Sequence, residues 1–429
     1  MTRMSKRNHE DASLKVLSLF SGCGGMDIGF EGDFHVLRKS INEKIHPKWF
    51  RDVNGNAWVR LPKTVFKTIF ANDILPAAKA SWVPYFTRGG RNGLTFRTES
   101  IVDLVKKHFA GQENIFPAAD VVIGGFPCQD FSVSGKRNGF NSHKAHHGGL
   151  IGQDDKISEE NRGKLYMWMR HVIDIVKPKI FIAENVKGLM TLADAKQIIE
   201  NDFRSIGGGG YLVVNAQVLR AQDYGVPQTR ERVVFMGFNK KDLKKEALKE
   251  LSALEVNPSF NPYPLPTHGD HKKNTDLSPH SRLKDAFVGL KEPAFTSDPA
   301  QKVYSKAKWY GRHCQGQSEV NLFGLGPTIR AEHHGNIEFR RLAKARGGTL
   351  EKELEAGLEE RRLTVRECAR IQTFPDEFEF IRTSSTMGRE YALSGSDAYR
   401  VIGNAVPPLL AFHIAWRLQE LWPKLFKKE

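Results

Sequence analysis

Cysteine is scarce in this chain of 429 residues. The four cysteines are Cys23, Cys128, Cys314 and Cys368, and no two of them form a CxxC pair. A small scaffold held by disulfides is therefore excluded, and a structural zinc site is disfavoured. This usage of cysteine fits a reducing cytosol, so we expect a cytoplasmic protein.

Long apolar runs are absent as well. No stretch reaches the roughly 18 apolar residues that a membrane span needs. The most apolar region near the C-terminus, residues 401–422, is interrupted by Asn404, Pro407, His413 and Arg417. The first 15 residues are polar and lack the apolar segment of a signal peptide, so we expect neither a membrane span nor secretion.

The composition is that of a soluble globular protein of two or three domains, with 40% hydrophobic and 26% charged residues. Basic residues dominate, because 64 Lys and Arg stand against 49 Asp and Glu and give a net charge of +15. A surplus of this size predicts a polyanionic partner, and nucleic acid is the simplest one.

Short apolar runs alternate with helical patterns through the first half of the chain. We expect strands over residues 15–20, 65–71, 120–124, 179–183, 211–219 and 232–237. This spacing predicts an α/β fold with a mostly parallel sheet. From residue 239 to about 362 the alternation fades and Pro, Asn, His and Lys increase, which predicts a separate, smaller domain of irregular or β structure.

Chemically useful residues follow four of these runs. They are a glycine-rich loop (Ser21-Gly22-Cys23-Gly24-Gly25), Asp73, Cys128 and Glu184. Ligands of open α/β sheets bind outside the carboxyl ends of the strands, so we expect these four groups to converge at one edge.

The glycine-rich loop does not have the GxGxxG spacing of a dinucleotide site, which disfavours a nicotinamide dehydrogenase. An acid after the next strand suits a ribose diol, so Asp73 suggests a nucleoside without a pyrophosphate, such as S-adenosylmethionine. Asp73 could instead only cap a helix.

Cys128 and Glu184 could bracket a planar heterocycle. A thiolate can attack a ring carbon while a carboxyl group bonds to a ring nitrogen, which makes the adjacent carbon nucleophilic towards a methyl donor. A lone cysteine is more often a buried structural residue, which is our interpretation of Cys314 and Cys368.

Residues 301–350 form a basic, aromatic segment, with nine Lys or Arg against three Asp or Glu. Tyr304, Trp309, Tyr310 and Phe323 are interleaved, as suits contacts to the grooves and bases of a nucleic acid, although a solvated face would have the same composition. Leu350, Leu354 and Leu358 have helical spacing within a Glu-rich run, which predicts a short amphipathic helix. Residues 33–63 and 141–161 look like insertions without an assigned role.

Six motifs together resemble those of the cytosine-5 DNA methyltransferases of bacterial restriction-modification systems, and in the same order. They are residues 20–25, Gly125-Phe126-Pro127-Cys128-Gln129, Glu184-Asn185-Val186, Gln228-Thr229-Arg230-Glu231-Arg232, residues 362–370 and Gly403-Asn404-Ala405-Val406-Pro407-Pro408. They span residues 17 to about 410. The resemblance implies a Rossmann-like methyltransferase domain over 1–238, completed by 388–429, and a target-recognition domain over 239–387.

The resemblance also implies roles for individual residues. The catalytic residues would be Cys128, Glu184, Arg230 and Arg232. The S-adenosylmethionine site would contain Phe20, Gly22, Gly24, Gly25, Asp73, Ser100, Pro127, Leu165 and Asn404. Contacts to double-stranded DNA would come from Ser132, Lys136, Arg137, Gln228, Thr328, Arg330, His333, His334, Asn336 and Arg340.

The chain departs from the family in three places. The acid expected after the third strand is replaced by Ser100, with Glu99 one residue earlier. The loop between Cys128 and Glu184 is long and rich in histidine, but no carboxylate or cysteine completes a metal site there, so we expect no metal. The 33–63 insertion is the third departure.

Two alternatives to a DNA-modifying enzyme remain open. The same chemistry could act on tRNA, although the large variable region suits duplex DNA better. A non-catalytic DNA-binding relative is the other alternative, and the presence of all four implied catalytic residues speaks against it. We expect a monomer that works beside a separate restriction endonuclease, in the bacterial cytoplasm at the nucleoid.

Overall fold

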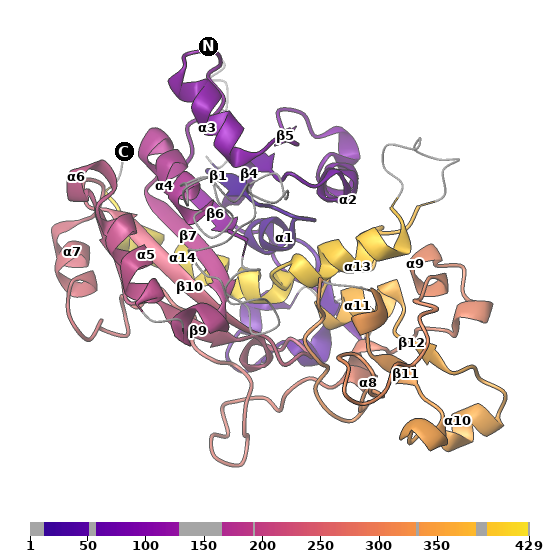
Figure 1. Cartoon of the computed structure of the whole chain (residues 1–429). Helices are drawn as coiled ribbons and strands as arrows, with labels where there is room; N and C mark the ends of the chain where they lie inside the picture. The colour runs from indigo at the N-terminus through magenta and orange to yellow at the C-terminus, as the bar shows by residue number, and fades with distance from the viewer. Residues whose placement is uncertain are drawn as a thin grey trace, which may run out of the picture.

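One large sheet forms the centre of the computed structural model, which describes residues 13–50, 57–127, 165–191, 194–331, 334–382 and 393–427 (Figure 1). Its strands lie in the order β5-β4-β1-β6-β7-β10-β8, and β9 pairs with β10. Their bounds are β1 (Leu14–Leu19), β4 (Phe66–Asn72), β5 (Thr95–Arg97), β6 (Val121–Gly125), β7 (Ile180–Val186), β8 (Tyr211–Val213), β9 (Gln217–Arg220) and β10 (Glu231–Asn239).

The sheet is parallel from β5 to β7, and β10 runs antiparallel to β7, β8 and β9. The predicted α/β fold with a mostly parallel sheet is confirmed. The register places Leu19 beside Asn72 and Gly124, and Gly125 beside Glu184. Four strand ends therefore meet at one edge. The single strand predicted over 211–219 is wrong, because β8 and β9 are separate strands that both pair with β10.

Alternate side chains of each strand enter opposite cores, as the two-residue period of a strand requires. In β10, Val233 and Phe235 pack on one face and Val234 and Met236 on the other. Three helices pack on the first face: α3 (Ile101–Phe109), α4 (Leu165–Val176) and α5 (Ala195–Arg204). The other core contains α1 (Gly25–Glu31), α2 (Pro76–Phe86) and α14 (Pro408–Leu425).

The C-terminal helices return to the N-terminal part of the sheet. α14 packs directly on α1, where a Cβ atom on Gly29 would lie 2.4 Å from the Ala411 Cβ atom. α13 (Gly395–Asn404) starts at Ser394, whose hydroxyl accepts a hydrogen bond from the Asp397 N–H, and ends before the Pro407-Pro408 pair. This N-cap and the prolines define the two ends of α13, and residues 405–406 just after it pack on Gly25 at the start of α1.

The 33–63 insertion joins two parts of the molecule. It contains the β2 (His35–Leu37) and β3 (Trp58–Arg60) hairpin and the turns η1 (Arg38–Ser40) and η2 (Pro47–Trp49). Trp49 is 1% exposed and packs edge-on against Phe412 of α14. The Asn42 amide donates hydrogen bonds to the carbonyls of Thr267 and Asp276. The insertion therefore braces α14 against the 267–276 segment.

The described part of residues 240–382, which lies between β10 and α13, is largely irregular, as predicted (Figure 1, pink to orange). Its helices are α7 (Lys245–Leu251), α8 (Leu283–Ala286), α9 (Pro299–Lys302), α10 (Glu351–Glu355) and α11 (Val365–Ile371), and its strands are β11 (Phe339–Arg341) and β12 (Arg361–Arg362). The helix predicted over 350–358 is shorter, because Gly357 with φ 85° follows its end. The remaining short helices are α6 (Ile206–Gly209), η3 (Arg88–Gly90), η6 (Lys187–Thr191), η7 (Ala221–Tyr224), η8 (Pro293–Phe295), η9 (His334–Asn336) and η10 (Lys344–Arg346).

Buried ion pairs hold this irregular part together. Arg341 and Arg361 share the carboxylate of Glu292, at 2.8 and 3.0 Å, and Arg361 also pairs with Glu367 at 2.9 Å. Tyr263 lies beyond residue 239 in the sequence but is attached to the central sheet, because its hydroxyl donates a hydrogen bond to the Val234 carbonyl of β10. The division of the chain at residue 239 stays a prediction.

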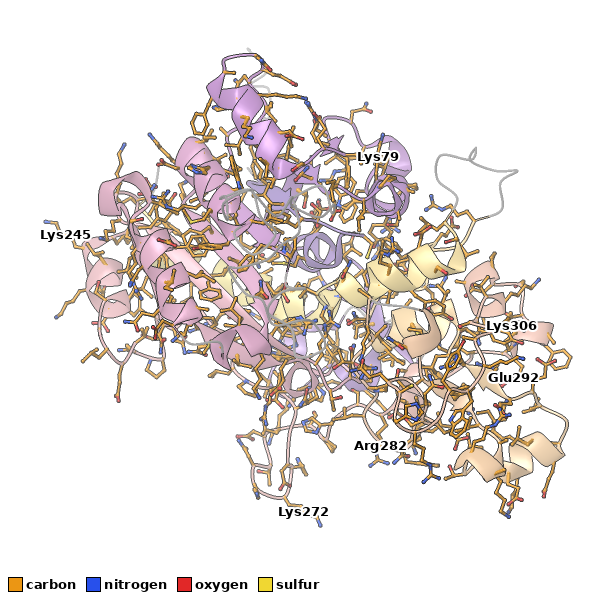
Figure 2. The ribbon with its side chains drawn as sticks, in the orientation of Figure 1. Lys79, Lys245, Lys272, Arg282, Glu292 and Lys306 are labelled. Carbon is orange, nitrogen blue, oxygen red and sulfur yellow. The ribbon has the colours of Figure 1, made fainter. Side chains whose placement is uncertain are left out.

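Lys79, Lys245, Lys272 and Lys306 lie at well-separated places around the molecule (Figure 2). Among the described residues, no helix combines the length and apolarity that crossing a bilayer requires.

Candidate active site

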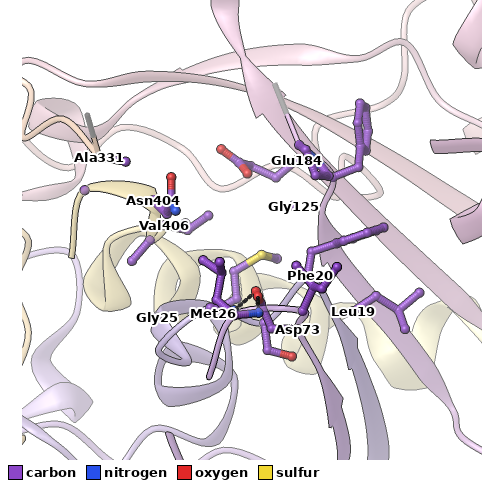
Figure 3. A pocket seen from close by; sticks show the side chains of 18 of the residues that line it. Leu19, Phe20, Gly25, Met26, Asp73, Gly125, Glu184, Ala331, Asn404 and Val406 are labelled. Carbon is purple, nitrogen blue, oxygen red and sulfur yellow. Dashed lines mark hydrogen bonds between the residues drawn. The ribbon is translucent and has the colours of Figure 1, made fainter. Parts of the chain in front are cut away.

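A cavity of about 770 Å³ opens where β1, β4, β6 and β7 end (Figure 3). Its volume lies within the range of small-molecule sites. The predicted residues that line it are Phe20, Gly22, Gly25, Asp73, Ser100, Pro127, Leu165, Glu184, Arg232, Thr328, Arg330 and Asn404. The predicted convergence of a glycine-rich loop and two acids at one edge of the sheet is therefore present in the structure.

The loop after β1 is tied to the acid after β4. The Gly22 N–H donates to Asp73 Oδ2 at 2.9 Å, and the Leu75 N–H donates to Oδ1 at 2.8 Å (Figure 3). Burial raises the pKa of the Asp73 carboxyl above its ordinary value, which these two hydrogen bonds oppose. Phe20 has φ 51°, a strained conformation for a side chain of this size, and such strain gathers at functional sites.

The two glycines at the start of α1 permit close packing. A Cβ atom on Gly24, which has φ 86°, would lie 2.6 Å from the Phe86 ring, so Gly24 packs on α2 and does not line the cavity. A Cβ atom on Gly25 would lie 2.2 Å from the Val406 carbonyl oxygen. Gly25 therefore lets residues 404–406 approach the loop after β1.

Ser100 and Glu99 lie at the end of the cavity next to α3. The Ser100 hydroxyl caps α3 by accepting a hydrogen bond from the Val102 N–H at 3.3 Å. Glu99 is ion-paired with Lys107 and Arg97, and these partners hold the pKa of its carboxyl below the ordinary value. Both residues line the cavity.

Glu184 is the acid at the other end of the cavity and is 8% exposed. Its Oε1 atom lies 2.7 Å from Arg232 Nε, which comes from the neighbouring strand β10. Burial raises the pKa of the Glu184 carboxyl, against the opposing effect of the Arg232 and Arg230 guanidinium groups. A Cβ atom on Gly125 would lie 2.6 Å from Glu184 Oε2, so any larger residue where β6 passes the carboxyl group would displace it.

The chain then leads from β6 towards Cys128. The Asn185 amide, next to Glu184, donates a hydrogen bond to the Phe126 carbonyl at 3.2 Å. This bond holds the backbone two residues before Cys128, and Pro127 lines the cavity. Cys128 itself lies outside the described residues, as do Ser132, Lys136, Arg137 and His333. The same applies to the side chain of His334.

The opposite wall is formed by residues 328–331 and α13. The Thr328 hydroxyl donates to the Thr229 carbonyl. Arg330 Nη1 donates to the Glu338 carboxylate at 2.9 Å, and Glu338 is 5% exposed. Burial raises the pKa of the Glu338 carboxyl, and Arg330 opposes this effect. A fixed guanidinium therefore stands in the wall opposite Glu184.

The family model for C-5 cytosine-specific DNA methylases matches residues 14–420 of the chain. The chain belongs to this family. It is 33% identical over 412 residues to the type II methyltransferase M.BsuRI of Bacillus subtilis, covering 94% of this chain and 78% of the relative. It is 32% identical to M.BspRI of Lysinibacillus sphaericus, covering 95% and 82%. The structure of the DNMT2 protein of Spodoptera frugiperda has the same fold, with a TM-score of 0.53, 15% identity and coverage of 95% and 99%.

The protein is thus a DNA cytosine-5 methyltransferase of restriction-modification type. Gln228 and Arg230, which belong to the Gln228-Thr229-Arg230-Glu231-Arg232 motif, lie behind the cavity. Arg230 is 1% exposed and donates to the carbonyls of Ile329, Gly403 and Ala405 at 2.8–3.1 Å. Gln228 is 0% exposed and bonds to Gln372 and to the Ile329 N–H. In the structure described they join chain segments and face neither the cavity nor solvent.

Two further predicted DNA contacts do not line the cavity. Arg340 is ion-paired with Glu353 at 3.4 Å, and Asn336 lies against Gly316. The expected site residues did not include others that line the cavity, among them Ile74, Gly125, Asn185, Ala331, Ser396 and Arg400. Gly125 and Asn185 stood within quoted motifs, and their place at strand ends was a usable signal. Nothing in the sequence marked Ser396 or Arg400.

Proposed function

We propose that this enzyme methylates C5 of a cytosine flipped out of a short, specific site in duplex DNA, through a covalent bond between Cys128 and C6 of the base. The observation that carries the proposal is the place of Glu184. Its buried carboxyl group lies beside the segment that leads to Cys128, in the same cavity as the tethered Asp73.

The donor set of the cavity fits S-adenosylmethionine. The Asp73 carboxylate accepts two backbone N–H groups, and a carboxylate has about four lone-pair sites, so two remain for the hydroxyls of a ribose. Ile101 and Leu165 offer apolar surface for an adenine ring, and Asn404 would lie at the methionine end. The bound cofactor would supply a methyl group on a positively charged sulfur.

Cytosine has to leave the DNA helix to reach this cavity, because C6 is inaccessible within the base stack. Flipping costs a few kcal/mol, which contacts in the cavity have to offset. Glu184 would bond to N3 and the exocyclic amine, and Arg232 would lie near O2. Both contacts withdraw electrons from the ring, and attack of the Cys128 thiolate on C6 then makes C5 nucleophilic. After methylation, loss of the C5 proton and elimination of the thiolate restore the ring.

Site recognition would come from the chain beyond β10. Thr328 and Arg330 line the cavity wall and are the predicted DNA contacts that its geometry supports best. The type II relatives support a role in protecting DNA from a partner restriction endonuclease, which would be a separate protein. We expect the enzyme to act as a monomer, in the bacterial cytoplasm.

Bisulfite sequencing of DNA from a methylation-deficient bacterium that expresses the protein tests this function. Protected cytosines confined to one short motif are expected, and the Cys128→Ser variant should protect none. If the soluble, cofactor-binding protein protects no cytosine in DNA, the proposal is wrong. Bisulfite sequencing of tRNA from the same cells then decides whether RNA is the substrate.

A further inference from the structure

We infer that Arg400, on α13, is a contact for the DNA phosphate backbone at the mouth of the active-site cavity. This inference rests on the proposed function, because it assumes that the cavity receives a base from duplex DNA. It assigns a role to a residue outside the six sequence motifs.

One face of α13 is turned towards the cavity. Ser396, Arg400, Gly403 and Asn404 line it, and Gly403 and Asn404 follow Arg400 by three and four residues, as Arg400 follows Ser396 by four, which places them along one side of a helix. The opposite side is fixed in the core. Cys23 Sγ donates to the Val401 carbonyl at 3.2 Å, and the buried Tyr399 hydroxyl donates to the Leu363 carbonyl at 2.6 Å.

The Arg400 side chain is available to a ligand. It is 51% exposed, and its Nη1 atom lies 3.8 Å from Asp397 Oδ1, beyond hydrogen-bonding distance. The Asp397 carboxylate already accepts a hydrogen bond from the Ser394 hydroxyl at 2.8 Å. An exposed ion pair of this length holds a guanidinium weakly, so a phosphate can replace it.

Arg400 lies towards the rim of the cavity. Asn404, at the proposed methionine end, is four residues further along α13, which corresponds to about 6 Å along the helix axis. Residues 330 and 331 pack against α13 at Gly403. A Cβ atom on Gly403 would lie 2.3 Å from the carbonyl carbon of Arg330. Arg330 and Arg400 therefore flank the same opening, Arg330 fixed by Glu338 and Arg400 held, within the part of the chain that the structure describes, only by its 3.8 Å ion pair with Asp397.

A phosphate is the group that this arrangement fits best. The guanidinium offers paired N–H donors to two phosphate oxygens, and phosphate contacts position a protein on DNA without reading sequence. We expect Arg400 to hold the backbone next to the flipped nucleotide, while the fixed Arg330 takes part in the site recognition proposed above.

The test compares duplex binding by fluorescence anisotropy at several salt concentrations for wild type, Arg400→Gln, Arg400→Lys and Lys245→Gln. Lys245 lies on α7, at the far end of the molecule from α9–α11 (Figure 2), and is the matched control. Arg400→Gln should raise the Kd for DNA about three- to tenfold and reduce the slope of log K against log salt by about 0.9. Arg400→Lys should restore most of the slope, and Lys245→Gln should match wild type.

Calorimetry of S-adenosylmethionine binding separates the remaining outcomes. An unchanged cofactor Kd in Arg400→Gln is expected. A raised cofactor Kd with unchanged DNA binding would overturn the inference and make Arg400 a cofactor contact. Wild-type affinity and slope in Arg400→Gln would overturn it as well. Methyl transfer by the wild-type preparation is measured in parallel, so a failure of the proposed function is seen separately.

Discussion

Arg232 Nε lies 2.7 Å from Glu184 Oε1, across the antiparallel pairing of β10 with β7. This pairing fixes one carboxyl oxygen and leaves Oε2 directed past Gly125. Burial raises the pKa of the Glu184 carboxyl group and Arg232 opposes this effect, and the raised pKa favours a proton that Glu184 can share with a ring nitrogen. The first two predictions follow from this arrangement.

Glu184→Gln should lower kcat by about 100-fold or more, because an amide cannot transfer a proton in the transition state. The Kd for DNA should stay within about threefold of wild type. Steady-state methyl transfer and duplex binding measure the two effects. Glu231→Gln is the matched control, since Glu231 lies on β10 beside Arg232 with its side chain 37% exposed and paired with Lys187. Equal kcat values in the two variants would contradict the role of Glu184.

Gly125→Ala should lower kcat by about ten- to a hundredfold with little loss of stability. The added methyl group would lie 2.6 Å from Glu184 Oε2 and has to displace the carboxyl group. Gly210→Ala is a suitable control, because its nearest contacts are at 3.5 Å and it has a negative φ. Wild-type kinetics in Gly125→Ala would show that the carboxyl position does not matter.

Arg230→Lys should destabilise the protein by about 3 kcal/mol, because one ammonium nitrogen cannot take the places of both Nη1 and Nη2, which bond buried carbonyls of two different segments. Urea unfolding measures this change. Arg60→Lys, at a half-exposed position on β3, should change the free energy of unfolding by about 0.5 kcal/mol or less. A similar small change for Arg230→Lys would mean that the guanidinium does not join the segments.

Asp27→Asn should alter the pH dependence of stability. Asp27 is fully buried beside Ser18, and burial raises the pKa of its carboxyl to about 7. Between about pH 4 and pH 7 the unfolded chain releases this proton while the folded protein keeps it, so wild-type stability falls as pH rises. Urea unfolding should show wild type losing about 3 kcal/mol relative to Asp27→Asn between pH 4 and pH 8. Parallel curves for the two proteins would contradict the buried, protonated state.

The sheet and its active edge could be predicted from the sequence, because buried parallel strands are continuous apolar runs and each one ends in a residue of distinct chemistry. The break between β8 and β9 could not. Residues 211–219 are apolar throughout except for Asn215 and Gln217, and only pairing with β10 shows that Val214 to Ala216 leave the strand.

The roles of individual motif residues were harder to predict. Arg230 and Gln228 stand in a motif of the active site, yet both are buried and bond to segments more than 95 residues away. Arg400 lines the cavity only because α13 packs against Cys23 and residues 330–331, a contact between distant parts of the chain. Sequence spacing indicates which residues share a strand end or a helix face, but not which distant face covers them.

The central claim is that Cys128 bonds to C6 of a flipped cytosine. Incubation with cofactor and a duplex whose target cytosine carries fluorine at C5 tests it. Elimination of the thiolate requires the hydrogen at C5 to leave as a proton, and fluorine in its place cannot leave as a cation, so the covalent bond to the enzyme stays. The account predicts a denaturant-resistant protein–DNA complex, formed only with cofactor, whose modified peptide contains Cys128. Absence of the complex with an otherwise active enzyme, or attachment at another residue, would contradict the account.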